Sequence, residues 1–188
     1  MSVVDFPARE GGRNGAFHLA LREATRAGHD TVDALFGQFA LDDVLSYAAF
    51  LTAHAKALIP VEDWADCARL IPHWTGRKVA LYHDLDALGR PLPPFEPLDW
   101  PRDLAGRWGA AYVLEGSRLG GGMLSRQVPP GLPCAYLGAV HERGGWQNFL
   151  RLLEAQAEQG GPDWQAAAIA SAGRTFALYA RAARSMAI

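Results

Sequence analysis

The sequence predicts a single all-helical domain, and three observations support this fold class. No stretch shows the sustained apolar and polar alternation, rich in valine, isoleucine and threonine, that is typical of a strand. Alanine, leucine and arginine dominate the periodic segments, and these residues favour helices. With 188 residues, 49% of them hydrophobic, the chain can build one sizeable core but is short for two domains. We expect residues 15–188 to form this domain and residues 1–14 to be a disordered N-terminus.

Proline and glycine set the expected helix boundaries. A helix opened by Asp42 and Asp43 is expected to stop before Pro60, because proline blocks helix propagation. Gly89 is expected to end another helix, and Pro162 suits the first turn of the last one. The expected helices cover about residues 16–36, 42–58, 62–70, 75–88, 101–122, 145–159 and 162–187, with loops at 89–101 and 127–133.

Composition excludes several classes of protein. The 18 basic and 20 acidic residues give a net charge of −2, without the basic excess of a general nucleic-acid binder. No apolar run approaches the roughly 20 residues of a membrane span, and Met1–Gly15 lacks the apolar core of a secretory signal. Cys67 and Cys134 are isolated, which favours a reducing compartment. We therefore expect a cytoplasmic protein with no nucleic-acid or membrane partner.

The common catalytic motifs are absent from the sequence. No glycine-rich phosphate-binding loop is present. The six histidines form no pair three or four residues apart, and none follows a glutamate at the spacing of helical di-iron sites. A metal cluster held by side chains alone is not predicted, so any redox chemistry needs a bound group.

The first expected helix carries charged residues on the face where burial is expected. Spacings of three and four place Leu21, Arg22, Thr25, His29, Val32, Asp33 and Phe36 on one stripe. Asp33 lies one turn after His29, so its carboxylate can reach one imidazole nitrogen and leave the other for a metal. Arg22 lies two turns earlier, about 10.5 Å along the axis. An exposed histidine–aspartate pair beside a solvated arginine would give the same pattern.

A glycine cluster is the second unusual feature. Gly116, Gly120, Gly121 and Gly122 follow a helical run, and each glycine inside a helix costs about 1 kcal/mol relative to alanine. Either something approaches the backbone too closely for a Cβ atom or the helix bends. Close packing between helices, or a plain loop, is the alternative. An imidazole on one helix and a glycine-lined, kinked helix opposite it would suit a flat ligand that carries a metal and an anion. Haem, with its iron and propionates, has these properties.

Two segments resemble the haem oxygenase family. Leu21–His29 (LREATRAGH) resembles its proximal-helix signature, and Tyr112–Gly121 (YVLEGSRLGG) resembles the distal-helix signature of the bacterial branch that accompanies bacteriophytochromes. Weaker similarity covers Asp84–Gly89 and Trp146–Leu150. The resemblance implies a haem oxygenase-like helical bundle with haem sandwiched between the proximal and kinked distal helices. It also implies a cytoplasmic oxidoreductase that cleaves haem to biliverdin, CO and ferrous iron.

The resemblance implies roles for particular residues and partners. His29 would bind the haem iron, Asp33 would support it, and Arg22 would lie near a propionate. Ser117 stands where the animal-type enzymes carry a distal aspartate. The other positions assigned to the haem site are Thr25, Tyr112, Gly116, Gly120, Gly121, Arg174 and Phe176. Haem would be both substrate and cofactor, O₂ the oxidant and a ferredoxin or reductase the external electron donor, with a bacteriophytochrome as a candidate acceptor of biliverdin.

The last expected helix and two rival functions leave alternatives open. From Trp164 onward the helix carries Arg174, Arg181 and Arg184 and no acidic residue, which fits a solvated basic face, a contact with a propionate or a docking site for an acidic electron donor. Phe176 can line the pocket or belong to the core.

The rival functions are a haem-binding or haem-delivery protein without turnover and a small-molecule enzyme of the related TenA-like fold.

Overall fold

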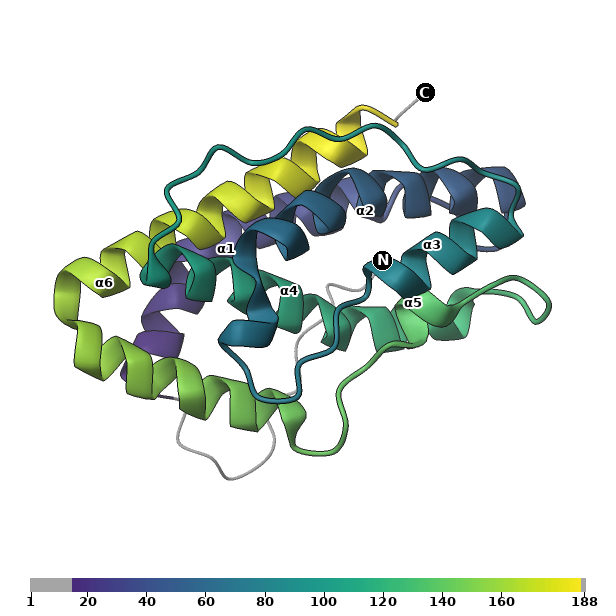
Figure 1. Ribbon diagram of the computed structural model, residues 1–188. Helices are drawn as coiled ribbons and strands as arrows, with labels where there is room; N and C mark the ends of the chain where they lie inside the picture. The colour runs from purple at the N-terminus through teal and green to yellow at the C-terminus, as the bar shows by residue number, and fades with distance from the viewer. Residues whose placement is uncertain (1–14, 187–188) are drawn as a thin grey trace.

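The computed structural model describes residues 15–186, which form helices and no strands (Figure 1). The N-terminal segment predicted to be disordered, residues 1–14, lies outside the described residues. The helices are α1 (Ala16–Phe36), α2 (Val44–Ala65), α3 (Lys78–Ala87), α4 (Leu104–Leu124), α5 (Ala135–Gly138) and α6 (Gly145–Arg184), with 3-10 turns at Cys67–Arg69 and Ser125–Gln127.

Helix α6 is the element around which the others are arranged. Helices α1, α2 and α4 all pack against it, whereas α1 and α4 barely touch each other. Gly161, with φ 68°, breaks α6 into two segments, which diverge at a sharp bend (Figure 1). The sequence prediction of two helices here, the second opened by Pro162, is confirmed. Few direct contacts join α1 to α4, and the region between these two helices is called the gap below.

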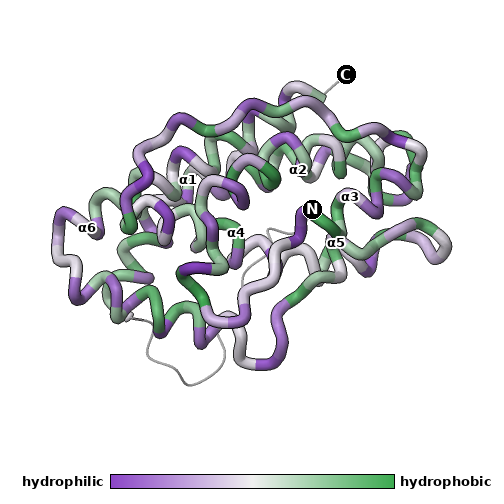
Figure 2. Tube along the Cα trace, in the orientation of Figure 1, coloured by the Kyte–Doolittle hydropathy of each residue, from purple (hydrophilic) through white to green (hydrophobic). Residues whose placement is uncertain are grey.

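Helix α2 runs further than the sequence predicted. It continues through Pro60 to Ala65 and ends at Asp66 in a left-handed conformation, so the expected stop before Pro60 is wrong. The segment around Pro60 is buried in the core, and its packing outweighs the lost backbone hydrogen bond. Most of α2 is hydrophobic (Figure 2). The helical stretch Val44–Arg69 is long and apolar enough to cross a membrane, but burial inside the bundle accounts for this composition.

Helix α4 passes through the glycine cluster without interruption. Asp103 caps its first turn by accepting a hydrogen bond from Gly106 N at 2.6 Å. The backbone remains helical to Leu124, and none of the clustered glycines has a positive φ. Earlier in the helix, a Cβ atom on Gly109 would lie 2.0 Å from the Ala168 carbonyl oxygen of α6. The absence of a side chain at Gly109 therefore allows α4 and α6 to cross at backbone contact.

We expect Gly109→Ala to destabilise the fold by about 1–3 kcal/mol, because the new methyl group must push α4 away from α6. Gly173→Ala is the matched control, since its methyl group would meet nothing within 4 Å and alanine favours a helix. Urea unfolding followed by circular dichroism measures both. An unchanged midpoint for Gly109→Ala would contradict the backbone contact.

Candidate functional site

His29 lies on α1 beside a carboxylate and an aromatic ring. Its Nδ1 is 3.3 Å from Asp33 Oδ2, one turn later, and its side chain is 35% exposed. The Phe176 ring of α6 packs against the imidazole edge at 5.9 Å between centroids. A Cβ atom on Gly28 would lie 3.1 Å from the Phe176 Cβ, so α1 approaches α6 closely here. The site therefore holds an oriented imidazole that remains accessible from one side.

The other polar residues of the α1 stripe are placed differently from one another. Arg22 is exposed. Thr25 is buried, and its hydroxyl donates to the Leu21 carbonyl oxygen at 2.8 Å within the same helix. The structure does not bring the Thr25 hydroxyl to the site, because helical geometry gives it a backbone partner.

Helix α4 presents Tyr112, Gly116 and Gly120 at successive turns. The Tyr112 ring meets the edge of the His18 ring of α1, with 5.9 Å between ring centres, so α1 and α4 touch here. A Cβ atom on Gly116 would meet Trp146 at 3.7 Å, whereas one on Gly120 would meet nothing within 4 Å. Gly120 therefore leaves open space beside the helix backbone.

Gly121 has a different role from the one expected. A Cβ atom there would lie 3.2 Å from the Leu137 carbonyl oxygen, so Gly121 packs α4 against α5. Close helix packing, the alternative considered for the cluster, applies at this position. Only part of the glycine cluster faces the gap, because successive residues of a helix point in different directions.

Ser117 is held in one orientation by a buried arginine. Its hydroxyl donates to the Leu114 carbonyl oxygen at 2.8 Å and accepts from Arg77 Nη2 at 2.5 Å. Arg77 is 2% exposed, and the same nitrogen donates to the Leu114 carbonyl at 2.9 Å. The sequence analysis missed Arg77, which precedes α3 and belongs to no periodic pattern.

Buried polar groups continue from Arg77 toward α1. The Arg77 guanidinium lies 5.1 Å from the centre of the Tyr136 ring, and Tyr136 OH is 2.8 Å from His54 Nδ1. His54 in turn packs against Phe36, at 4.3 Å between ring centres. Burial lowers the pKa of His54 to about 3, so its imidazole is neutral at physiological pH. The hydroxyl of Tyr179, 5.8 Å from His54 between ring centres, is buried without a partner. A chain of polar groups thus connects α4 with the far end of α1.

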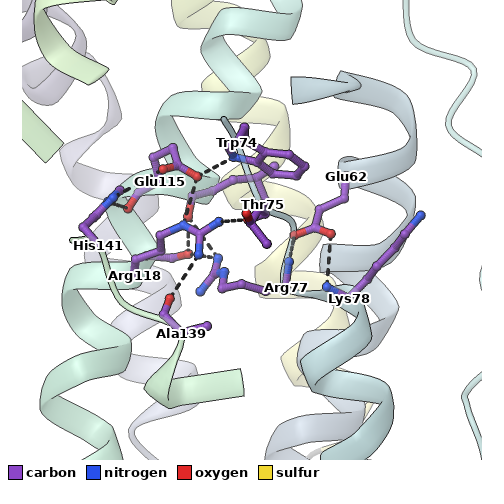
Figure 3. Close-up of polar contacts among 11 residues, drawn as sticks. Glu62, Trp74, Thr75, Arg77, Lys78, Glu115, Arg118, Ala139 and His141 are labelled. Atoms are coloured by element: carbon purple, nitrogen blue, oxygen red, sulfur yellow. Dashed lines mark hydrogen bonds and ion pairs between the residues drawn. The ribbon is translucent and has the colours of Figure 1, made fainter. Parts of the chain in front are cut away.

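A second polar network connects α4 to neighbouring segments of the chain (Figure 3). The buried Glu115 carboxylate accepts from Trp74 Nε1 at 2.8 Å and from Arg118 Nε at 3.0 Å, and lies 3.5 Å from His141 Nδ1. Arg118 also donates to the carbonyl oxygens of Thr75 and Ala139. These contacts fix α4 to the segments before α3 and after α5.

Glu62 of α2 positions Arg77 itself. Its buried carboxylate accepts from the backbone nitrogens of Arg77 at 2.7 Å and Lys78 at 3.1 Å (Figure 3). It therefore serves as the cap of α3. Burial raises the pKa of Glu62, while these hydrogen bonds oppose the shift. The cap explains why an arginine outside any regular helix has a fixed place.

Two further features lie away from the gap. The Arg174 guanidinium sits 5.6 Å from the centre of the Trp100 ring, in the loop before α4. Arg174 and Phe176 are two residues apart on α6, which points them to opposite sides.

A cavity of about 530 Å³ at the end of α2 includes Glu62, Asp63 and Asp66 in its lining. All three carboxylates already have partners.

Comparison with known proteins identifies the class of protein that this arrangement represents. The chain is 33% identical over 149 residues to a haem oxygenase of Xanthomonas campestris pv. campestris (strain 8004), an alignment that covers 73% of this chain and 88% of that protein. Crystal structures of the NO- and CO-bound haem oxygenase from Neisseria meningitidis supply a structural match with a TM-score of 0.76 and 26% identity, covering 90% of this chain and 91% of the other. No protein-family model matches the chain.

The chain therefore belongs to the haem oxygenase family. Its fold is the all-helical haem oxygenase fold, as the sequence predicted. Family membership also identifies it as an enzyme, an oxidoreductase of haem, and displaces the TenA-like alternative.

Proposed function

We propose that the chain binds haem in the gap between α1 and α4, with His29 as the iron ligand, and converts it to biliverdin, CO and ferrous iron. The observation that carries this proposal is the pairing of two features across the gap. An accessible imidazole, oriented by a carboxylate, lies on α1, and α4 presents a backbone without side chains at Gly120. A haem bound between the two helices would find a nitrogen ligand for its iron on α1 and a backbone without a side chain on α4.

Asp33 prepares His29 for this role. A carboxylate 3.3 Å from Nδ1 favours the tautomer that carries its proton on Nδ1 and its lone pair on Nε2. Contact with Phe176 limits the rotation of the ring. The haem supplies the iron that activates O₂ and is itself the substrate, with electrons from an external donor such as a ferredoxin or a reductase.

Ser117 provides a fixed polar point on α4. Because its proton goes to the Leu114 carbonyl and one lone pair accepts from Arg77, its second lone pair is left to accept from a water molecule. A guanidinium has donors and no acceptor, so Arg77 orients Ser117 and takes no proton from it. Behind Arg77, its guanidinium stacks on the Tyr136 ring, and the Tyr136 hydroxyl is hydrogen-bonded to the neutral His54. In this proposal, Ser117 and the groups behind it take the place of the distal aspartate that animal-type enzymes carry at this position of α4.

The proposal also covers the cellular compartment of the reaction and the acceptor of its product. We place it in the cytoplasm, where the two cysteines stay reduced, as their separate locations in the structure allow. The resemblance of Tyr112–Gly121 to the distal segment of phytochrome-associated enzymes supports a bacteriophytochrome as an acceptor of biliverdin.

Hemin titration of the purified protein tests the proposed function. We expect one hemin per chain with a sharp Soret band, followed by a green product with the mass of biliverdin once reductant and air are added. Exclusion of air should leave the haem intact. Binding without product would favour a haem-delivery protein, and absence of saturable binding would contradict the proposal.

A further inference from the structure

Glu115 and Arg118, one turn apart on α4, hold the segment that connects α5 to α6. Arg118 Nη1 donates to the Ala139 carbonyl oxygen at 3.0 Å, and the Glu115 carboxylate lies 3.5 Å from His141 Nδ1 (Figure 3). The Trp146 ring, at the start of α6, lies 6.0 Å from the His141 ring between centres. The His141 side chain is only 12% exposed. Its imidazole is therefore largely enclosed between α4 and the start of α6.

Both ring nitrogens of His141 face groups that accept hydrogen bonds and cannot donate them. Nε2 lies 2.9 Å from the Glu115 backbone carbonyl oxygen, and Nδ1 faces Oε2 of the same residue. A neutral imidazole has one N–H group and one lone pair. In either neutral tautomer, the lone pair of the ring would face an oxygen lone pair. The doubly protonated imidazolium makes both contacts as a donor.

The charges around His141 agree with an imidazolium. The Glu115 carboxylate accepts from Arg118 Nε through Oε1 and faces His141 through Oε2, so each cation has its own carboxylate oxygen. Arg118 also interacts with the Glu62 carboxylate. The buried Cys67 thiol is neutral, because burial and the charge of Glu115 both raise its pKa. The other side chains beside this pair are the neutral indoles of Trp74 and Trp146 and the exposed groups of Glu142 and Arg143.

The contact between His141 and the Glu115 carbonyl bears on the proposed haem site. This carbonyl belongs to the α4 backbone directly before Gly116 and Ser117. Two successive carbonyls accept from side chains of other segments here, Leu114 from Arg77 and Glu115 from His141. A side-chain donor on a helix carbonyl affects the local course of the helix. The bond from His141 therefore helps to set where this part of the α4 backbone lies.

We propose that His141 is an imidazolium at neutral pH and that this charge makes it a positioning residue for the α4 backbone at Gly116 and Ser117. Its stabilising contribution is present while the ring is charged. It is lost as the pH rises and Nδ1 releases its proton, because the lone pair of Nδ1 then faces a carboxylate. The effect on catalysis rests on the proposed haem function, whereas the protonation state of the ring does not.

Nitrogen NMR of the haem-free, isotope-labelled protein reads the protonation state directly. At about pH 7 we expect both ring nitrogens of His141 to show the chemical shifts of protonated nitrogens. Nδ1 should move toward the unprotonated range as the pH is raised. The exposed His83 of α3 gives the response of a solvated imidazole in the same sample. An unprotonated nitrogen of His141 at about pH 7 would assign a neutral tautomer and overturn the proposal.

His141→Gln separates the charge from the hydrogen bond, because its amide can still donate to the Glu115 carbonyl. Urea unfolding should show a folding equilibrium constant about ten-fold below wild type at about pH 6 and within about three-fold of it at about pH 9. His83→Gln, the matched control, should stay within about two-fold at both pH values. An equal loss for His141→Gln at both pH values would assign His141 to packing and contradict the charge.

The rate of biliverdin formation tests the positioning role. Wild type should be about ten-fold faster than His141→Gln at about pH 6 and lose most of this advantage at about pH 9, with haem affinities that agree within about three-fold. A rate ratio that does not change with pH would overturn the positioning role. Absence of haem binding by the wild-type chain would instead contradict the proposed function, while the nitrogen shifts still decide the state of His141. These shifts also decide it if His141→Gln does not fold.

Discussion

Replacing His29 by alanine should abolish the Soret band of the one-to-one hemin complex and the formation of biliverdin. The imidazole lies on α1, is partly exposed and is oriented by the 3.3 Å contact with Asp33. Without it the iron has no nitrogen ligand from α1. Hemin titration at micromolar concentration and a biliverdin assay with reductant and air measure the two losses.

Matched variants separate loss of the ligand from loss of the fold. His83→Ala removes an exposed imidazole from α3 and should leave both signals intact. Added imidazole should partly restore the spectrum of His29→Ala by occupying the vacated space. Asp33→Asn should weaken haem binding or turnover about 10-fold to 100-fold, because the imidazole loses its orienting carboxylate. A wild-type spectrum from His29→Ala would rule out His29 as the iron ligand.

Replacing Arg77 by methionine should lower the rate of biliverdin formation about 100-fold and change hemin affinity by less than about three-fold, because Arg77 orients a proton-handling group without contacting the ligand. Methionine keeps the unbranched stem but cannot donate to Ser117 Oγ or to the Leu114 carbonyl. Ser117 would then be free to rotate. Single-turnover absorption changes after addition of reductant and air measure the rate, and titration measures the affinity.

Arg77→Lys and Ser117→Ala test the same contact from both sides. Lysine keeps the charge but not the planar group that reaches two acceptors, so it should recover only part of the rate. Ser117→Ala should slow the reaction as well, and the double variant with Arg77→Met should be no slower than the slower single one. Additive losses in the double variant would mean that the two residues act separately.

Local sequence signals predicted much of the fold. The bounds of α1 match the expected 16–36, Gly89 with φ 63° follows α3, and the break in α6 falls at Gly161. In each case a residue with a strong backbone preference coincides with a boundary. Pro60 is the exception, because burial of the surrounding segment in the core decides its conformation. The four-residue helix α5 is too short to produce a periodic pattern.

The candidate site was only partly visible in the sequence for a different reason. His29 and Asp33 are one turn apart on a helix, so their spacing indicated the contact. Arg77, Tyr136 and His54 come from three separate segments and meet only through packing. The glycines of the cluster have different structural roles, since Gly120 has open space beside it whereas Gly121 packs against α5. Sequence spacing cannot distinguish these two uses of a missing Cβ atom.

A crystal structure of the hemin complex measures the central claim most directly. We predict iron bonded to Nε2 of His29, the porphyrin plane between α1 and α4 with the Gly120 backbone over it, and a propionate near Arg22. Iron bonded to another side chain, or hemin bound outside this gap, would contradict the account.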